Sequence, residues 1–148
     1  MDKHAHVFYF VGLRRKRTGK GMRLVWSIPS ELRRTMKNHP WVRELPVAIT
    51  VVNAEGIILE MNNKSVETFG ADGGEALIGK NALECHPEPS RTKLARLLEA
   101  PEANIYTIEK EGRRRMICQI PWFRSRKFAG IVELSIEIPD DVPHFVRA

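Results

Sequence analysis

Apolar and polar residues alternate along residues 128–138, near the end of the chain. From position 132 onward every second residue is apolar, and the residues between are Glu or Ser. Such alternation is typical of a β-strand whose sheet has one buried face and one partly wetted face. The predicted apolar face consists of Val132, Leu134, Ile136 and Ile138.

Two more strands are predicted just before this one, over residues 103–110 and 113–123, with a turn at Glu111-Gly112. The second of them alternates again, and we expect its more apolar set of positions to face the interior. That set is Met116, Cys118, Ile120 and Trp122, and the residues between are Arg115, Ile117 and Gln119.

A β-hairpin is predicted over residues 47–61. Its β-branched runs flank the connection Asn53-Ala54-Glu55-Gly56, which contains residues that tight turns favour. Residues 62–90 predict short helices, and Ser90 is the predicted N-cap of a longer helix with an apolar stripe at Leu94, Leu97 and Leu98. The expected fold is α+β, with a five-stranded antiparallel sheet and all helices on one face.

The positive charge is concentrated ahead of this region. Residues 1–40 hold ten Lys and Arg against two Asp and Glu, a net charge of +8, whereas the other 108 hold 14 against 16, a net charge of −2. Residues 1–29 are interpreted as a flexible basic arm, because residues 13–23 are highly charged and lack a hydrophobic period. Such a run favours nucleic acid or an anionic membrane, and the plainer alternative is a disordered leader.

Residues 30–44 predict a short amphipathic helix or linker. Leu32 and Met36 have helical spacing after the predicted N-cap Ser30, and Pro40 is expected to end the helix. A helix of this kind packs on its own domain or pairs with a second copy, as in a homodimer. The domain then spans residues 45–138, and residues 139–148 form an acidic, proline-containing tail.

The composition fits one soluble domain. Hydrophobic residues make up 43% of the 148 and charged residues 28%, and no apolar run approaches the roughly 20 residues of a membrane-spanning helix. The two cysteines, Cys85 and Cys118, are too few for a disulfide framework and fit a reducing compartment. We therefore expect a cytoplasmic protein.

The strand order and several short motifs within residues 45–138 resemble the PAS family of sensory domains. The run 52–58, VNAEGII, is similar to the family's D-x-x-G-x-I hairpin, and the run 63–70, NKSVETFG, to its N-x-A-x-x-x-x-G helix with Ser65 in place of alanine. The run 77–80, LIGK, matches the family's step before the next helix. Cys85-His86-Pro87 is similar to a bacterial PAS subgroup that has this motif before the longer helix.

The resemblance implies a regulatory role. PAS domains bind a small ligand or cofactor between helices and sheet, or mediate dimerisation, and relay a change to an effector. The sequence has no G-x-x-x-x-G-K-[ST] phosphate loop, and we expect the effector on another chain. The expected protein is a non-catalytic sensor without catalytic residues or a metal site.

The candidate ligand-binding residues are the apolar ones expected between helices and sheet. The lining of an apolar pocket and a filled core both require such residues. The set is Phe69, Leu94, Leu98, Met116, Cys118, Ile120 and Trp122.

His86 is the candidate cofactor ligand. Haem-binding PAS domains use a histidine from the helical side, so the resemblance allows haem bound by His86, with Met116 as a second ligand. Pro87 and Pro89 place His86 in the loop before the helix, and the alternative is a backbone hydrogen bond that fixes this loop. The cofactor stays unknown, and flavin photochemistry is not expected because the N-C-R-F-L-Q run is missing.

Three functions remain as alternatives. The leading one is a homodimeric sensor of a small molecule, and the second is a dimerisation or interaction module with a filled core. The third is nucleic-acid contact through residues 13–23. Ile117 and Ile131 are expected to be exposed on the sheet, where they form an apolar patch for the N-terminal helix or a second copy.

Overall fold

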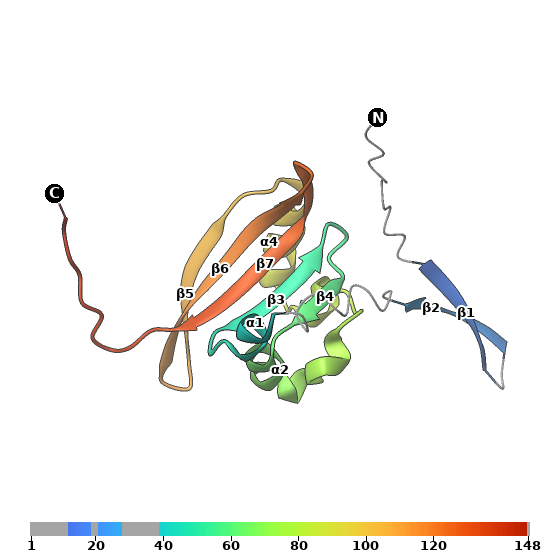
Figure 1. Cartoon of the computed structure of the whole chain (residues 1–148), viewed down its shortest axis with the longest axis horizontal. Helices are drawn as coiled ribbons and strands as arrows, with labels where there is room; N and C mark the ends of the chain where they lie inside the picture. The colour runs from blue at the N-terminus through green and yellow to red at the C-terminus, as the bar shows by residue number, and fades with distance from the viewer. Residues whose placement is uncertain (1–11, 19–20, 28–38, 148) are drawn as a thin grey trace.

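The computed structural model describes residues 12–18, 21–27 and 39–147. Its main unit is a five-stranded antiparallel sheet in the order β4-β3-β7-β6-β5, with helices on one face (Figure 1). The strands are β3 (Ala48–Asn53), β4 (Ile58–Met61), β5 (Asn104–Lys110), β6 (Arg113–Arg124) and β7 (Lys127–Glu137). The predicted α+β fold class, with two strands, then helices, then three strands, is confirmed.

Most of the helices are short. They are α1 (Pro40–Glu44), α2 (Asn63–Thr68), the 3-10 helices η3 (Gly70–Asp72) and η4 (Gly74–Leu77), α3 (Ala82–Cys85) and the longer α4 (Ser90–Glu99). Within the described ranges, none is long and apolar enough to cross a membrane.

The longer helix, α4, begins differently from the prediction. Ser90 is its first helical residue rather than its N-cap, and Pro89 at the N-cap makes no side-chain capping bond. Instead, the Glu88 carboxylate accepts hydrogen bonds from the backbone N–H of Thr92 at 3.2 Å and from its hydroxyl at 2.8 Å. Glu88 therefore supplies the acceptor that the sequence assigned to Ser90.

Asn62 ties the start of the domain to the sheet. Its side chain is fully buried, and its Oδ1 accepts hydrogen bonds from the backbone N–H of Ile49 and of Ser65, both at 2.9 Å. The second of these is the N-cap of α2. Its Nδ2 donates to the carbonyl of Val47 at 2.8 Å, and more weakly to those of Val42 at 3.2 Å and Leu45. One buried amide thus connects the segment after α1, strand β3 and helix α2.

The hydrophobic core lies between the helices and one face of the sheet. The sheet side of the core consists of side chains from β3, β4 and β7. The other side consists of side chains from η4, α3 and α4. Burial of these side chains is the main force that holds the short helices in place, because helices of this length are marginal on their own. The buried cluster is Val52, Ile58, Met61, Leu77, Ala82, Leu94, Leu97 and Ile131.

The strand register shows which residues share each face. Directly opposed residues in an antiparallel sheet point to the same side. Thr50 is opposite Glu133, Glu133 is opposite Gln119, and Gln119 is opposite Asn104, so these four lie in one row across the sheet. This row is on the helix side, because Thr50 and Glu133 line a cavity together with residues of the helices.

The predicted inward set of β6 is therefore on the wrong side. Met116, Cys118 and Ile120 are opposite Ile136, Leu134 and Val132, one position out of step with the helix-side row, and Trp122 continues the same alternation. Ile117 and Ile131, expected to be exposed, are only 6% and 2% accessible. The prediction failed because the more apolar set of positions was assigned to the core, whereas the core side of β6 carries Gln119.

The N-terminal region also differs from the predicted flexible arm. β1 (Gly12–Thr18) and β2 (Gly21–Ser27) pair as an antiparallel hairpin, with Leu13 opposite Trp26 and Thr18 opposite Gly21. Only two residues separate the strands in the sequence, and one is a glycine, which suits a tight hairpin connection. Nucleic-acid contact through residues 13–23 stays a prediction.

The predicted helix before the domain lies mostly outside the described residues, since residues 28–38 are not among them. Pro40 begins α1, and the expectation that it ends the preceding helix concerns residues outside those described. Proline suits the first turn of a helix, where its missing N–H has no intrahelical partner to lose.

Candidate ligand-binding cavity

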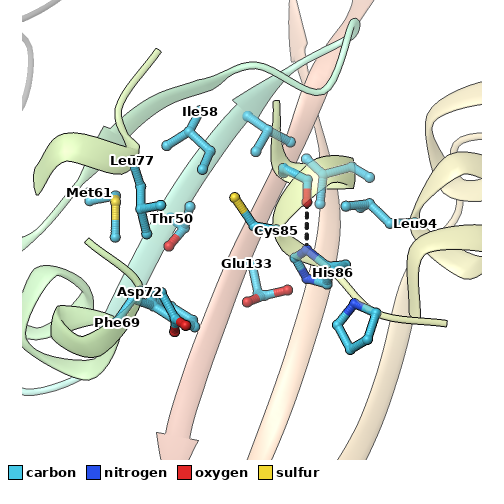
Figure 2. A pocket seen from close by; sticks show the side chains of 14 residues that line it. Thr50, Ile58, Met61, Phe69, Asp72, Leu77, Cys85, His86, Leu94 and Glu133 are labelled. Carbon is cyan, nitrogen blue, oxygen red and sulfur yellow. Dashed lines mark hydrogen bonds between the residues drawn. The ribbon is translucent and has the colours of Figure 1, made fainter. Parts of the chain in front are cut away.

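A cavity of about 240 Å³ lies between the sheet and the helices (Figure 2). Its walls come from β3, β4 and β7 on the sheet side and from η3, η4, α3, α4 and the residues between them on the helix side. Most of the lining side chains are apolar: Val52, Ile58, Met61, Phe69, Leu77, Ala82, Pro87, Leu94 and Ile131. An apolar wall with a few polar groups is typical of sites for small organic ligands.

The polar residues of the lining are Thr50, Asp72, Cys85, His86 and Glu133. Asp72 and Cys85 are exposed, as is Pro87 beside them, so the cavity opens to solvent between η3 and the connection from α3 to α4. Thr50 is already engaged, because its hydroxyl lies 2.6 Å from that of the buried Ser65. The groups left for a ligand are two carboxylates, a thiol and an imidazole.

His86 is fixed by the loop in which it lies. Its Nδ1 is 2.7 Å from the carbonyl oxygen of Ala82, the bond drawn in Figure 2. A protonated Nδ1 donates to this carbonyl and leaves Nε2 as the second ring nitrogen. Arg91 Nε donates to the carbonyls of Leu83 at 3.0 Å and His86 at 3.1 Å, which holds the loop on α4. The backbone hydrogen bond predicted for His86 is confirmed.

The carboxylate of Glu133 is held by hydrogen bonds that run through two side-chain amides. Gln119 Nε2 donates to Glu133 Oε2 at 2.8 Å, and Gln119 Oε1 accepts from Asn104 Nδ2 at 2.6 Å. Gln119 is only 4% accessible, so the middle of this chain of hydrogen bonds is buried, whereas Asn104 and Glu133 at its ends are half-buried. A carboxylate that is ionised accepts only, and this requires the amide NH₂ of Gln119 to face Glu133.

The carboxylate of Glu133 also affects the pKa of Tyr106, in the next row of the sheet. Burial raises the pKa of the Tyr106 hydroxyl above its ordinary value, and the negative charge of Glu133 raises it further. Tyr106 is opposite Ile117 on the helix side, and Lys93 Nζ of α4 lies 4.9 Å from the centre of its ring. The charge of Glu133 therefore acts on the hydroxyl of Tyr106, beside the cavity.

The structure brings together only part of the predicted site. Phe69, His86 and Leu94 line the cavity, whereas Leu98 packs against the core cluster without reaching the lining. The predicted residues of β6 lie on the opposite face of the sheet: Met116, Cys118, Ile120 and Trp122.

Sequence reasoning missed the polar half of the site. Glu133 was placed on the wetted face by its strand's alternation, and Gln119 was placed there with it. Asp72 lies in a glycine-rich stretch that gave no periodic signal. The available signal was Glu133 itself, a charged residue in the middle of a largely apolar strand. A solvent-exposed face accounts for such a residue as well as a cavity does, so the alternation alone did not indicate a cavity.

Haem does not fit this site. Met116 lies on the other face of the sheet from His86, so the two cannot flank one iron. The cavity of about 240 Å³ is also below the range of roughly 300–1,000 Å³ that drug-sized ligands occupy, and haem is larger than these. Among the described residues, no group of three or more His, Cys, Asp or Glu side chains is placed to hold a metal ion.

Comparisons with known proteins agree with the fold. The model of the PAS fold family matches residues 31–117, which is more than half of the chain. The chain therefore belongs to the PAS family, whose members are generally non-catalytic sensory modules. A search of curated proteins found no match.

Solved structures with a similar fold come from several proteins. The C-terminal domain of a Streptococcus mutans protein is 18% identical, with a TM-score of 0.56, and the match covers 84% of this chain and 92% of that one. The PAS domain of histidine kinase ThkA is 22% identical, with a TM-score of 0.51 and coverages of 61% and 97%. The Vibrio cholerae VqmA dimer, described as a DNA-binding receptor, is 16% identical, with a TM-score of 0.53 and coverages of 76% and 57%. At these identities the likeness shows the fold alone.

Proposed function

We propose that this chain is a non-catalytic PAS sensor that binds a small organic molecule in the cavity between sheet and helices. The observation that carries the proposal is the cavity itself, with an apolar wall, an open mouth and several polar groups at one end. The rival hypothesis, an interaction module with a filled core, requires side chains to occupy this volume. The volume instead suits a ligand smaller than a drug.

The cavity also has the connections that a sensor needs. Its floor includes Glu133 of β7, which reaches the edge strand β5 through Gln119 and Asn104. Its mouth includes the loop of His86, which Arg91 fastens to α4. A ligand that binds one arrangement of these groups more tightly than another shifts the population toward it, and this is how a binding event is passed to a partner.

Two matched variants test this proposal. Cys85→Trp places a large ring at the exposed mouth, and Met116→Trp places the same ring on the opposite face of the sheet. Native mass spectrometry of the full chain, with a pooled library of small metabolites, is expected to show a bound mass in the wild type and in Met116→Trp. Cys85→Trp is expected to lose it. A bare protein mass for the wild type, or equal binding by both variants, overturns the proposal.

We further propose that signalling uses a homodimer in which the uncovered face of the sheet meets its copy. Helix α4 lies on the other face (Figure 1). This face presents an uncharged stripe on β6 and β7, and a two-fold axis buries such a stripe against itself without leaving a charge unpaired. The stripe consists of Met116, Cys118, Ile120, Val132, Leu134 and Ile136.

The dimer is tested by placing a charge in the stripe. Leu134→Glu is expected to convert a dimer to a monomer in sedimentation velocity, because two buried carboxylates then face each other. Glu55→Lys changes the charge of the exposed turn between β3 and β4 and is the control. A monomeric wild type, or a dimer that Leu134→Glu leaves intact, contradicts this use of the face.

A further inference from the structure

The polar groups of the cavity are unequally divided between donors and acceptors. Two carboxylates, those of Asp72 and Glu133, belong to the lining, and none of the described lining residues is Lys or Arg. The hydroxyl of Thr50 is paired with Ser65. A ligand carboxylate or phosphate entering this cavity would meet like charge with no lysine or arginine of the lining to pair with it, which disfavours it.

Glu133 is the better placed of the two carboxylates. It lies within β7, half-buried, and Figure 2 shows it among the lining side chains with His86 and Cys85. The hydrogen bond from Gln119 occupies Oε2 and leaves Oε1 as an acceptor for a donor in the cavity. An ionised acceptor held in one orientation makes stronger hydrogen bonds than a neutral or mobile one.

Gln119 determines that orientation. Its amide is nearly completely buried and is held in turn by Asn104, so rotation of the Glu133 carboxylate would break the hydrogen bond that this buried amide donates. An unpaired buried polar group is costly. Gln119 is therefore a positioning residue for the cavity, although it does not line it.

From these contacts we propose that the ligand is a small, largely apolar amine, whose positively charged nitrogen donates a hydrogen bond to Glu133 Oε1. The proposal rests on the proposed function, since it names the chemical class of molecule that the same cavity binds. The apolar body of the amine lies against the wall formed by Met61, Leu77 and Leu94. One aromatic ring is of suitable size, because an engineered cavity of about 150 Å³ holds benzene.

The test compares three probes of the same shape and different charge, namely benzylamine, benzyl alcohol and benzoate. The full chain is labelled at its Met, Leu and Ile methyl groups, and the probes are titrated at neutral pH. The signals of Met61, Leu77 and Leu94 report occupancy of the cavity. Benzylamine is expected to bind at least tenfold more tightly than benzyl alcohol, and benzoate more weakly than either.

Two variants then locate the preference. Glu133→Gln keeps the size of the side chain and removes its charge, and it is expected to reduce the preference for benzylamine over benzyl alcohol to less than threefold. Glu137→Gln removes a carboxylate from the same strand, outside the lining, where Glu137 pairs with Arg113 at 3.5 Å. This control is expected to leave the preference unchanged.

A third variant tests the positioning role. Gln119→Leu is expected to reduce the preference for the amine while the binding of benzyl alcohol stays the same, because the apolar wall is intact. A purely structural role for Gln119 would weaken both probes equally, which overturns the positioning role.

The outcomes separate this inference from the proposed function. Equal affinity of the wild type for benzylamine and benzyl alcohol, or a preference that survives in Glu133→Gln, overturns the amine inference and leaves the cavity as a ligand site. If none of the three probes shifts the methyl signals of the cavity, the amine inference is overturned. If the metabolite library also gives no bound mass, the proposed function is overturned with it.

Discussion

On the helix side of the sheet, β7 presents Ile131 and Glu133, whereas on the uncovered side the same strand presents Val132 and Leu134. The covered side carries a row of polar side chains that are joined by hydrogen bonds: Glu133 with Gln119, Gln119 with Asn104, and Thr50 with Ser65. The uncovered side of β7 is more uniformly apolar. In this domain, therefore, a polar row marks the interior cavity and an apolar stripe marks the outer face.

The comparison has a physical basis. A polar group beside a ligand cavity is favourable only if neighbouring side chains satisfy it, so the cavity side carries a hydrogen-bonded row. The uncovered face of a single chain is stabilised when another surface removes its apolar side chains from water. Because the stripe carries no charge, this burial does not remove a charged group from water. Three predictions test this contrast between the two faces.

The largest predicted loss of stability is at Gly130 of β7, which lies opposite Asn53 of β3. Gly130 has φ +137°, and a Cβ there would collide with the backbone oxygen of Val52 and lie 2.7 Å from Asn53 Cα. The indole N–H of Trp122 also crosses β7 at this level to donate to Val52 O at 3.0 Å. Gly130→Ala is expected to lower the free energy of unfolding by about 4 kcal/mol, measured by urea denaturation.

Gly112 supplies the matched control for this prediction. It has φ +70° but nothing within 4 Å of the added Cβ, so Gly112→Ala tests the backbone conformation without the collision. Its expected cost is about 1 kcal/mol. Equal losses in the two variants would show that the close approach of β7 and β3 is not what selects glycine at position 130.

The next effect compares the two faces directly. Ile131→Ala removes a side chain that is 2% accessible and packs in the core, and the expected loss is about 3 kcal/mol. Leu134→Ala removes a half-buried side chain from the uncovered face, with an expected loss of about 1 kcal/mol. Urea unfolding at two protein concentrations measures both. The proposed dimer predicts that the loss for Leu134→Ala rises above about 1 kcal/mol at the higher protein concentration, and the same loss at both concentrations would show that no second copy covers the outer face.

The fold was predictable because its strands carry local signals. The turn residues between β3 and β4, and the alternation in β6 and β7, each act over a few positions, and the strand order follows from them. Local signals do not determine which set of a strand's side chains faces the core. A shift of one residue moves every side chain to the other side, and in β6 both sets of positions contain apolar residues, so periodicity did not decide between them.

The candidate site was only partly predictable for the same reason. Phe69, Leu94 and His86 come from segments whose helical or loop position was clear, and they do line the cavity. Glu133 and Gln119 are joined only through the register of β6 and β7. A hydrogen bond between side chains 14 residues apart depends on the pairing of two strands, and no local pattern in the sequence contains that information.

The smallest expected effect is a dependence of stability on high pH. The pKa of Tyr106 is raised above 10.0 by burial first and by Glu133 second. As the pH rises above 10.0, the unfolded chain loses this proton before the folded chain does, so the unfolded state binds fewer protons and stability falls with pH. Below that pH the contribution of Tyr106 is fully present. Tyr106→Phe is expected to remove this part of the decline.

The titration itself shows how far the charge of Glu133 reaches. Tyr9 is the only other tyrosine in the sequence, so in a Tyr9→Phe background the ultraviolet absorbance of tyrosinate reports Tyr106 alone. Glu133→Gln is expected to lower the pKa of Tyr106 part of the way toward 10.0, because burial is the larger cause and remains in the variant. Glu137→Gln, on the same strand, is expected to leave it unchanged. A Tyr106 pKa that Glu133→Gln does not move would mean that the charge of Glu133 does not reach Tyr106, and the contrast between the two faces would then rest on apolar packing alone.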